Sequence, residues 1–151
     1  MKVAINKCYG GFHLSVEAVK RLYALKDPHL EVMSIKKYYG IDNKSTRDIN
    51  IKFKYCDKNG KLDMKKINED AKWMGHLIIG DNYIFDEHHW GHKSEIRACP
   101  LLIKVIEELG DKANHSSISN LKIVTIPDGI EWEIGEYDGI EWIDEKHRSW
   151  S

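Results

Sequence analysis

The stretch that most constrains the fold is the beginning of the chain, residues 2–15. Residues 3–5 form a continuous apolar run, which is typical of a strand buried on both faces. Gly10 and Gly11 follow, and glycine accepts positive φ angles and the close approach of other groups. Ser15 is a good N-cap for residues 16–25, whose apolar side chains recur at helical spacing. The sequence therefore predicts a strand, a glycine turn and a helix.

This order of elements is also a candidate ligand site. A strand that ends in glycines and leads into a helix aims backbone N–H groups and the positive end of the helix dipole at one place. Such a place suits a phosphate or a carboxylate. An ordinary turn without a ligand explains a glycine pair equally well, so the pattern gives a place for a ligand but not its identity.

The composition excludes several classes of protein. No apolar run approaches the roughly 20 residues that a membrane helix needs, and no apolar leader precedes the first strand, so we expect a cytoplasmic protein with no membrane partner. The net charge is −1, and residues 131–144 hold six acids and no base, which argues against nucleic-acid binding. Three widely spaced cysteines indicate free thiols in a reducing compartment.

The remaining elements follow from periodicity and turn residues. Pro100 and Gly110 bound a predicted helix over 100–109, and Asp138-Gly139 predicts the turn of a C-terminal β-hairpin. Further patterns predict strands at 30–39, 49–55 and 121–126, a short helix at 61–72 and a hairpin at 76–85. We expect an α/β or α+β fold with a Rossmann-like start, a central mixed sheet, two main helices and the C-terminal hairpin. The 151 residues would form one domain, 1–151, with an insertion-like region at about 40–96.

Two groups of reactive side chains have ordinary interpretations beside functional ones. His88, His89 and His92 are the densest set of potential metal ligands, but their glycine-containing segment favours a solvated or ligand-touching loop over a zinc site. Cys8 lies beside Lys7 and near a helix start, where a thiol can be activated. A free cysteine at a strand end is more often simply packed, and no base is adjacent in sequence. We therefore expect no metal and no cofactor, and Cys8 remains only an alternative catalytic residue.

Polar and aromatic groups that could surround one pocket occur at both ends of the chain. Aromatic rings offer faces for stacking a base, and arginine offers a bidentate donor to phosphate. The candidate ligand-binding residues are Asn6, Lys7, Cys8, Tyr9, Gly10, Gly11, Phe12, Ser15, Arg97, His147, Arg148 and Trp150. A structural role explains Arg97 and Arg148 equally well. Trp132 and Trp142 are better explained as cross-strand partners on the hairpin.

The whole chain resembles a family of small uncharacterised proteins of phages and prophages. The shared residues are Asn6-Lys7-Cys8-Tyr9-Gly10-Gly11-Phe12 with Leu14-Ser15, then Arg97, Pro100 and Val105-Ile106-Glu107-Glu108-Leu109-Gly110, and finally Ile126-Pro127-Asp128, Glu131-Trp132-Glu133-Ile134, Glu136-Tyr137-Asp138-Gly139 and His147-Arg148 with Trp150. The middle of the chain is not covered. Cys99 departs from the pattern, since an aspartate usually precedes the helix proline. The resemblance implies a phage origin and hence the cytoplasm of an infected bacterial host.

The opening also resembles the first strand and helix of type B ribose-5-phosphate isomerases. In that family an Asp-His-x-Gly-Phe turn follows the strand, and here its two polar positions are occupied by Cys8 and Tyr9. The later glycine-rich phosphate loop with its catalytic cysteine is absent, since nothing like it follows Cys56 or Cys99. This local resemblance implies a Rossmann-like start and a pocket shaped for a sugar phosphate, without isomerase activity.

These observations predict a phage-encoded binding protein that sequesters a nucleotide or sugar-phosphate metabolite, such as a host immune signal. Gly10 and Gly11 would present N–H groups, Arg97 or Arg148 would pair with phosphate, and Tyr9 or Phe12 would stack on a base. Sequestration needs no acid–base pair, which favours a protein that is not an enzyme. Exposed edges of the C-terminal hairpin also predict a homo-oligomer.

Two alternatives remain open. One is an isomerase-like enzyme acting on a sugar phosphate, with Cys8 and one of His13, His88 or His147 as proton carriers. The other is an inhibitor that binds a host protein, using its acidic C-terminal region to meet a basic surface.

Overall fold

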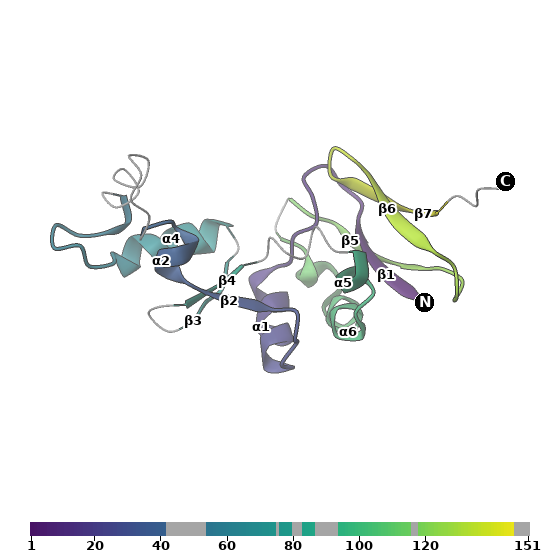
Figure 1. The fold of residues 1–151 in the computed structure, drawn as a ribbon, viewed down its shortest axis with the longest axis horizontal. Helices are drawn as coiled ribbons and strands as arrows, with labels where there is room; N and C mark the ends of the chain where they lie inside the picture. Colours follow the sequence, from purple (N-terminus) through teal and green to yellow (C-terminus); the bar gives the residue numbers. More distant parts are fainter. Residues whose placement is uncertain (42–53, 75, 80–82, 87–93, 116–117, 147–151) are drawn as a thin grey trace. The chain divides into compact units, whose positions relative to one another are not determined.

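The computed structural model describes residues 1–41, 54–74, 76–79, 83–86, 94–115 and 118–146 (Figure 1). Contacts divide the chain into two compact units. Unit 1 consists of Met1–His29 and Glu87–Ser151, and unit 2 consists of Leu30–Asp86. Unit 2 therefore interrupts unit 1 in sequence, and it overlaps the insertion-like region, about 40–96, that the sequence predicts.

Unit 1 contains two pairs of antiparallel strands and two longer helices. Its elements are β1 (Lys2–Asn6), α1 (Val16–Ala24), α5 (Ser94–Arg97), α6 (Pro100–Leu109), the 3-10 helix η1 (Gly110–Ala113), β5 (Leu121–Thr125), β6 (Trp132–Tyr137) and β7 (Ile140–Glu145). β1 pairs with β5, from Lys2 opposite Thr125 to Asn6 opposite Leu121. β6 and β7 form the C-terminal hairpin, so that prediction is confirmed.

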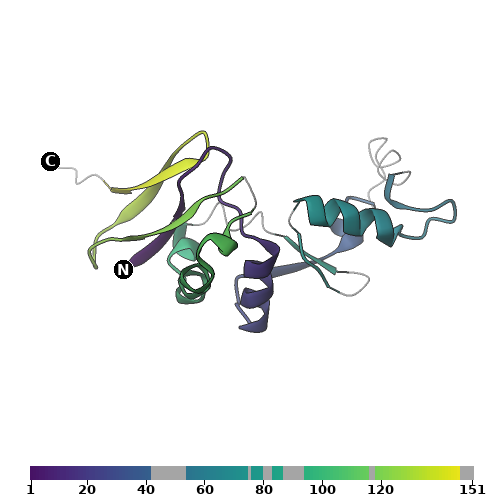
Figure 2. The same cartoon turned by 180° about the vertical axis from the view of Figure 1, so that it is seen from behind.

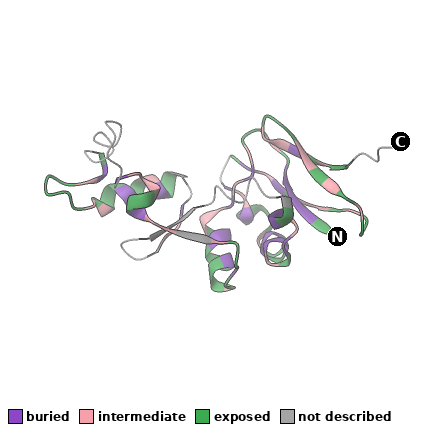
Figure 3. Ribbon diagram, viewed as in Figure 1, coloured by how far each residue is buried: buried purple, intermediate pink, exposed green. Residues whose placement is uncertain are grey.

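The core of unit 1 lies between β1 and the helices. Val3 and Ala4 are fully buried on β1, as the continuous apolar run predicts. α6 contacts α1, β1 and β5, and it contributes the fully buried Leu102 and Val105. Buried segments of unit 1 are coloured purple in Figure 3. α1 contributes Leu22, also fully buried. Each such side chain contributes roughly 1.5–3 kcal/mol to folding, so this apolar layer fixes where the ends of β1 and α6 lie.

Unit 2 is a small antiparallel sheet with two helices. Its elements are β2 (Glu31–Ser34), α2 (Ile35–Tyr38), α4 (Met64–Met74), β3 (Ile78–Ile79) and β4 (Tyr83–Asp86) (Figure 2). The strand order is β2-β4-β3. Ile35, Ile41, Tyr55 and Ile67 form its core. Burial raises the pKa of Tyr39 and of Tyr55 above the ordinary value of a phenol.

The mixed helix and strand content agrees with the sequence, but the finer architecture that the sequence predicts is not shown. Every strand pairing in the described residues is antiparallel and the sheets are separate, so neither a Rossmann-like parallel start nor a central mixed sheet is seen there. The strand expected at 30–39 is β2 alone, because Ser34 N-caps α2 by accepting from the Lys37 N–H at 3.2 Å. Most of the strand expected at 49–55 lies outside the described residues. Within the described ranges, no helix has the length and apolar character needed to cross a membrane.

Candidate functional site

The turn that follows β1, residues 7–11, is confined on two sides by other segments of unit 1. Gly10 and Gly11 have φ angles of 133° and 137°, which L side chains rarely adopt. A Cβ atom on Gly10 would overlap the carbonyl oxygen of Ile118, and one on Gly139 would lie 2.6 Å from the Gly10 nitrogen. Only glycine fits at both positions, so the loop before β5 and the hairpin turn jointly define the shape of this turn.

Asn6 fixes the turn from within unit 1. It is fully buried, and its amide Nδ2 donates to the carbonyl oxygens of Cys8 at 2.8 Å and Gly139 at 2.6 Å. Its Oδ1 accepts from the Asn120 N–H at 2.8 Å, and its own backbone N–H donates to Glu141 Oε2 at 2.8 Å. One side chain therefore joins β1, the glycine turn, the start of β5 and the hairpin.

A buried ion pair supports the same region. Arg97 on α5 donates through Nη1 and Nη2 to the two carboxylate oxygens of Glu141 on β7, each at 2.8 Å. Nη1 also donates to the carbonyl oxygen of Ala4 at 3.2 Å, and the guanidinium lies 3.5 Å from the ring centroid of Phe12. Arg97 is 1% exposed. Removing one partner would leave an uncompensated buried charge, so loss of either side chain should be strongly destabilising.

The groups that the turn exposes are a cation, an aromatic ring and backbone. Tyr9 is 67% exposed, and Lys7 is exposed with its Nζ 3.5 Å from the Glu141 carbonyl oxygen. Gly10 is exposed and Gly11 half-buried. The half-buried Cys8 thiol donates to the Ile118 carbonyl at 3.2 Å and lies 3.5 Å from Asn6 Oδ1. Both acceptors are carbonyl oxygens rather than a base.

The start of α1 is not part of this turn. Residues 12–14 intervene, and Leu14 forms an isolated bridge with Asn114. Ser15 caps α1 by accepting from the Ala18 N–H at 3.1 Å, and its hydroxyl donates to the Lys112 carbonyl at 2.6 Å. The helix terminus that the sequence associates with the glycine turn is therefore capped by its own serine.

The structure thus brings together most of the candidate residues of the first strand and turn, with different roles. Asn6, Phe12 and Arg97 are buried, whereas Lys7 and Tyr9 are exposed. Three other candidates, His147, Arg148 and Trp150, lie outside the described residues, as do His88, His89 and His92 of the metal alternative.

The hairpin tryptophans do have cross-strand partners, but not each other. Trp142 stands opposite Gly135, and its ring covers that glycine so closely that a Cβ there would overlap it. Trp132 stands opposite Glu145. Both tryptophan rings therefore pack within the C-terminal hairpin and are not part of the turn after β1.

Glu141, the partner of Arg97, is not among the residues that the sequence predicts for the site. The hairpin holds many acids, and nothing in composition separates this one from the rest. The alternation of β7 does not separate it either, because residues 141, 143 and 145, which share one face of the strand, are Glu, Ile and Glu.

No protein-family model, no curated protein and no solved structure matches this chain.

Proposed function

We propose that this protein binds and sequesters a small phosphate-containing metabolite of the nucleotide or sugar-phosphate type at the turn after β1. The observation that carries the proposal is that an exposed aromatic ring, an exposed cation and two positive-φ glycines occur on one turn that is fixed from beneath. Backbone held in rare conformations is common at ligand sites.

Each exposed group has a role that its chemistry suits. The Tyr9 ring offers a face for stacking on a base or sugar. The Lys7 ammonium is a point charge for phosphate. The N–H groups of Gly10 and Gly11 are donors on backbone without side chains, which lets an anion approach closely.

The buried network has a supporting role in this proposal. Arg97 is engaged by Glu141 and stacked on Phe12, so we assign it to positioning the turn rather than to pairing with phosphate. Asn6 has the same role through its bonds to Cys8 and Gly139. A turn that is already ordered loses little conformational freedom on binding, which favours affinity.

The resemblance to phage and prophage proteins supplies the biological setting that we propose. It comprises a phage origin, a host immune signal as the ligand and the cytoplasm of an infected bacterium. A homo-oligomer, which the edges of the C-terminal hairpin predict, is also part of the proposal. The Rossmann-like start is likewise a prediction. For catalysis by Cys8 no observation adds support, because its thiol contacts carbonyl oxygens.

A thermal-shift screen tests the proposal on the full chain, using nucleotides, cyclic nucleotides, ADP-ribose derivatives and sugar phosphates. A ligand at 100 times its Kd should stabilise the protein by about 2.7 kcal/mol. Tyr9→Ala should weaken binding by about tenfold or more, since stacking on one ring contributes roughly 1–3 kcal/mol. The control is Tyr23→Ala, which removes an exposed tyrosine of α1, outside the turn, and this variant should bind the ligand as the wild type does.

Each outcome of the screen bears on the proposal. A ligand recovered unchanged supports sequestration, and a ligand recovered altered replaces it with the enzyme alternative. Failure of the whole panel, or equal binding by Tyr9→Ala and Tyr23→Ala, would overturn the assignment of this turn.

A further inference from the structure

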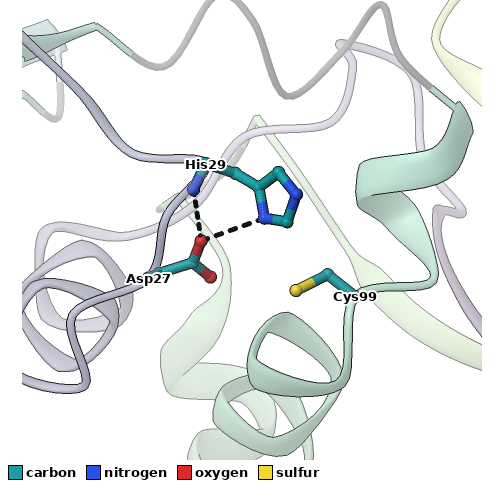
Figure 4. A group of neighbouring side chains, drawn as sticks. All are labelled: Asp27, His29 and Cys99. Carbon is teal, nitrogen blue, oxygen red and sulfur yellow. Dashed lines mark hydrogen bonds and ion pairs between the residues drawn. The ribbon is translucent and has the colours of Figure 1, made fainter.

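A second cluster of side chains lies in unit 1, at the end of α1 and the beginning of α6. It contains Asp27, His29 and Cys99, and one potential ligand atom from each lies within 4.8 Å of the others (Figure 4). The three side chains come from two segments that are 70 residues apart in sequence, since Cys99 follows His29 by that number. Sequence analysis considered none of them as a ligand.

Asp27 has bonding capacity that the protein does not use. Its side chain is 0% exposed. Its Oδ1 accepts from the His29 backbone N–H at 2.8 Å and lies 3.1 Å from His29 Nδ1. Its Oδ2 is buried and has no hydrogen-bond partner among the described residues. Buried carboxylate oxygens are normally paired, so an unpartnered one indicates a missing cation or donor.

Cys99 supplies a free sulfur at the same place. It occupies the N-cap of α6, where serine, threonine, aspartate and asparagine are preferred, and its side chain makes no capping bond. Instead the sulfur faces the Asp27 carboxylate and the His29 ring (Figure 4). Cys99 is buried, whereas 41% of the His29 side chain is exposed, so the cluster is open to solvent on the histidine side.

We propose that Asp27, His29 and Cys99 bind a divalent transition-metal ion, with Zn²⁺ as the best match. Thiolate and imidazole ligands select zinc over calcium and magnesium, which prefer oxygen ligands. A thiolate and a carboxylate together neutralise a divalent cation, which limits the cost of placing it in a largely buried site. The Asp27 Oδ1 bond to the His29 N–H holds the two ligands of the first segment in position.

Three protein ligands leave one position of a tetrahedral ion free. Structural zinc sites have four protein ligands, whereas sites with three keep a water or another ligand in the fourth position. The exposed side of His29 is where such a ligand can enter. The site is separate from the turn after β1 and does not depend on the ligand proposed there.

Metal binding by the full chain is measured by competition with a chromogenic zinc chelator, and Co²⁺ replaces Zn²⁺ for spectroscopy. We expect one equivalent of Zn²⁺ and a thiolate-to-cobalt charge-transfer band. Cys99→Ser should abolish that band and weaken Zn²⁺ binding by tenfold or more. Because serine is a preferred N-cap, this variant should fold normally without metal, as a thermal melt in EDTA would show.

Three further variants complete the test. Asp27→Asn and His29→Gln should each weaken Zn²⁺ binding by tenfold or more. The matched control is Cys56→Ser, a half-buried cysteine of unit 2, which should bind Zn²⁺ and give the cobalt band as the wild type does. Absence of stoichiometric binding would overturn the proposal, as would a Cys99→Ser variant that binds like Cys56→Ser. Loss of binding only when His88, His89 and His92 are all replaced by alanine would assign the metal to that other segment instead.

Discussion

Among the described residues of unit 1, two carboxylates are buried, those of Glu141 and Asp27, and their hydrogen bonding differs. Both oxygens of Glu141 accept from Arg97, and Oε2 also accepts from the Asn6 N–H. Asp27 uses Oδ1 alone, and its Oδ2 has no hydrogen-bond partner in the described part of the chain. A fully paired buried carboxylate serves to hold elements together, whereas an incompletely paired one is available to a ligand. This difference assigns Glu141 to support of the turn and Asp27 to the metal site.

The largest effect is expected from Glu141→Gln. The amide cannot neutralise Arg97, which would remain as a buried, unpaired charge, so the free energy of unfolding should fall by about 3 kcal/mol or more. Urea denaturation at neutral pH measures it. Glu133→Gln, at an exposed position on the neighbouring strand β6, should change stability by less than about 0.5 kcal/mol. If both substitutions lower the free energy of unfolding equally, pairing with Arg97 does not make Glu141 more important for stability than an exposed glutamate.

The next largest effect is expected at the turn that this pair supports. Gly10→Ala places a methyl group against the Ile118 carbonyl at a φ of 133°, and should cost about 2–3 kcal/mol. Gly129→Ala is the control, since Gly129 also has a positive φ but nothing lies within 4 Å of its Cβ position. That variant should cost only about 1 kcal/mol. Similar losses in the two denaturation curves would mean that strain, and not close packing, limits residue 10.

Asp27→Asn makes the same carboxylate-to-amide change at the incompletely paired site. Without metal the loss should be about 1 kcal/mol or less, because the side-chain oxygen can still accept from the His29 N–H and Oδ2 has no bond to lose. With Zn²⁺ present the wild type should gain stability and the variant should not. Melts in EDTA and in Zn²⁺ give both values. If Asp27→Asn without metal lowers the free energy of unfolding as much as Glu141→Gln does, the two carboxylates do not differ in the way proposed.

The smallest effect concerns an exposed ion pair. Asp128 Oδ1 lies 2.6 Å from the N-terminal amino group, and this hydrogen bond lowers the pKa of Asp128. A carboxyl whose pKa is lower in the folded state adds stability above its unfolded pKa, and loses it as the pH falls through the folded value. The difference between wild type and Asp128→Asn should therefore be small at neutral pH and vanish in acid. A difference that does not decrease as the solution is made acidic would contradict this assignment.

The elements of unit 1 were largely predictable from sequence because their signals are local. The apolar run of β1, the Ser15 cap of α1, Pro100 at the start of α6 and the Asp138-Gly139 turn all act within a few residues. Asp138 and Gly139 have φ angles of 50° and 88°, as a tight hairpin turn requires.

Pairing partners were not predictable, because they depend on contacts between distant segments. A strand, a glycine turn and a helix occur in both parallel and antiparallel architectures, so the partner of β1 could not be deduced from its own residues. Arg97 pairs with Glu141, which is 44 residues away in sequence. Asp27 lies near Cys99 although the whole of unit 2 separates them in sequence. The end of β2 was also not predictable. The sequence predicts a strand over 30–39, but Ser34 caps α2 and the strand ends there.

We propose that the turn after β1 is the surface that binds the ligand. The most direct measurement is an NMR titration of the ¹⁵N-labelled full chain with the metabolite panel, following the backbone amides. We predict that the largest shifts occur at residues 7–11, while the amides of Asp27, His29 and Cys99 do not move. Saturable shifts elsewhere in the chain, with residues 7–11 unchanged, would contradict the account.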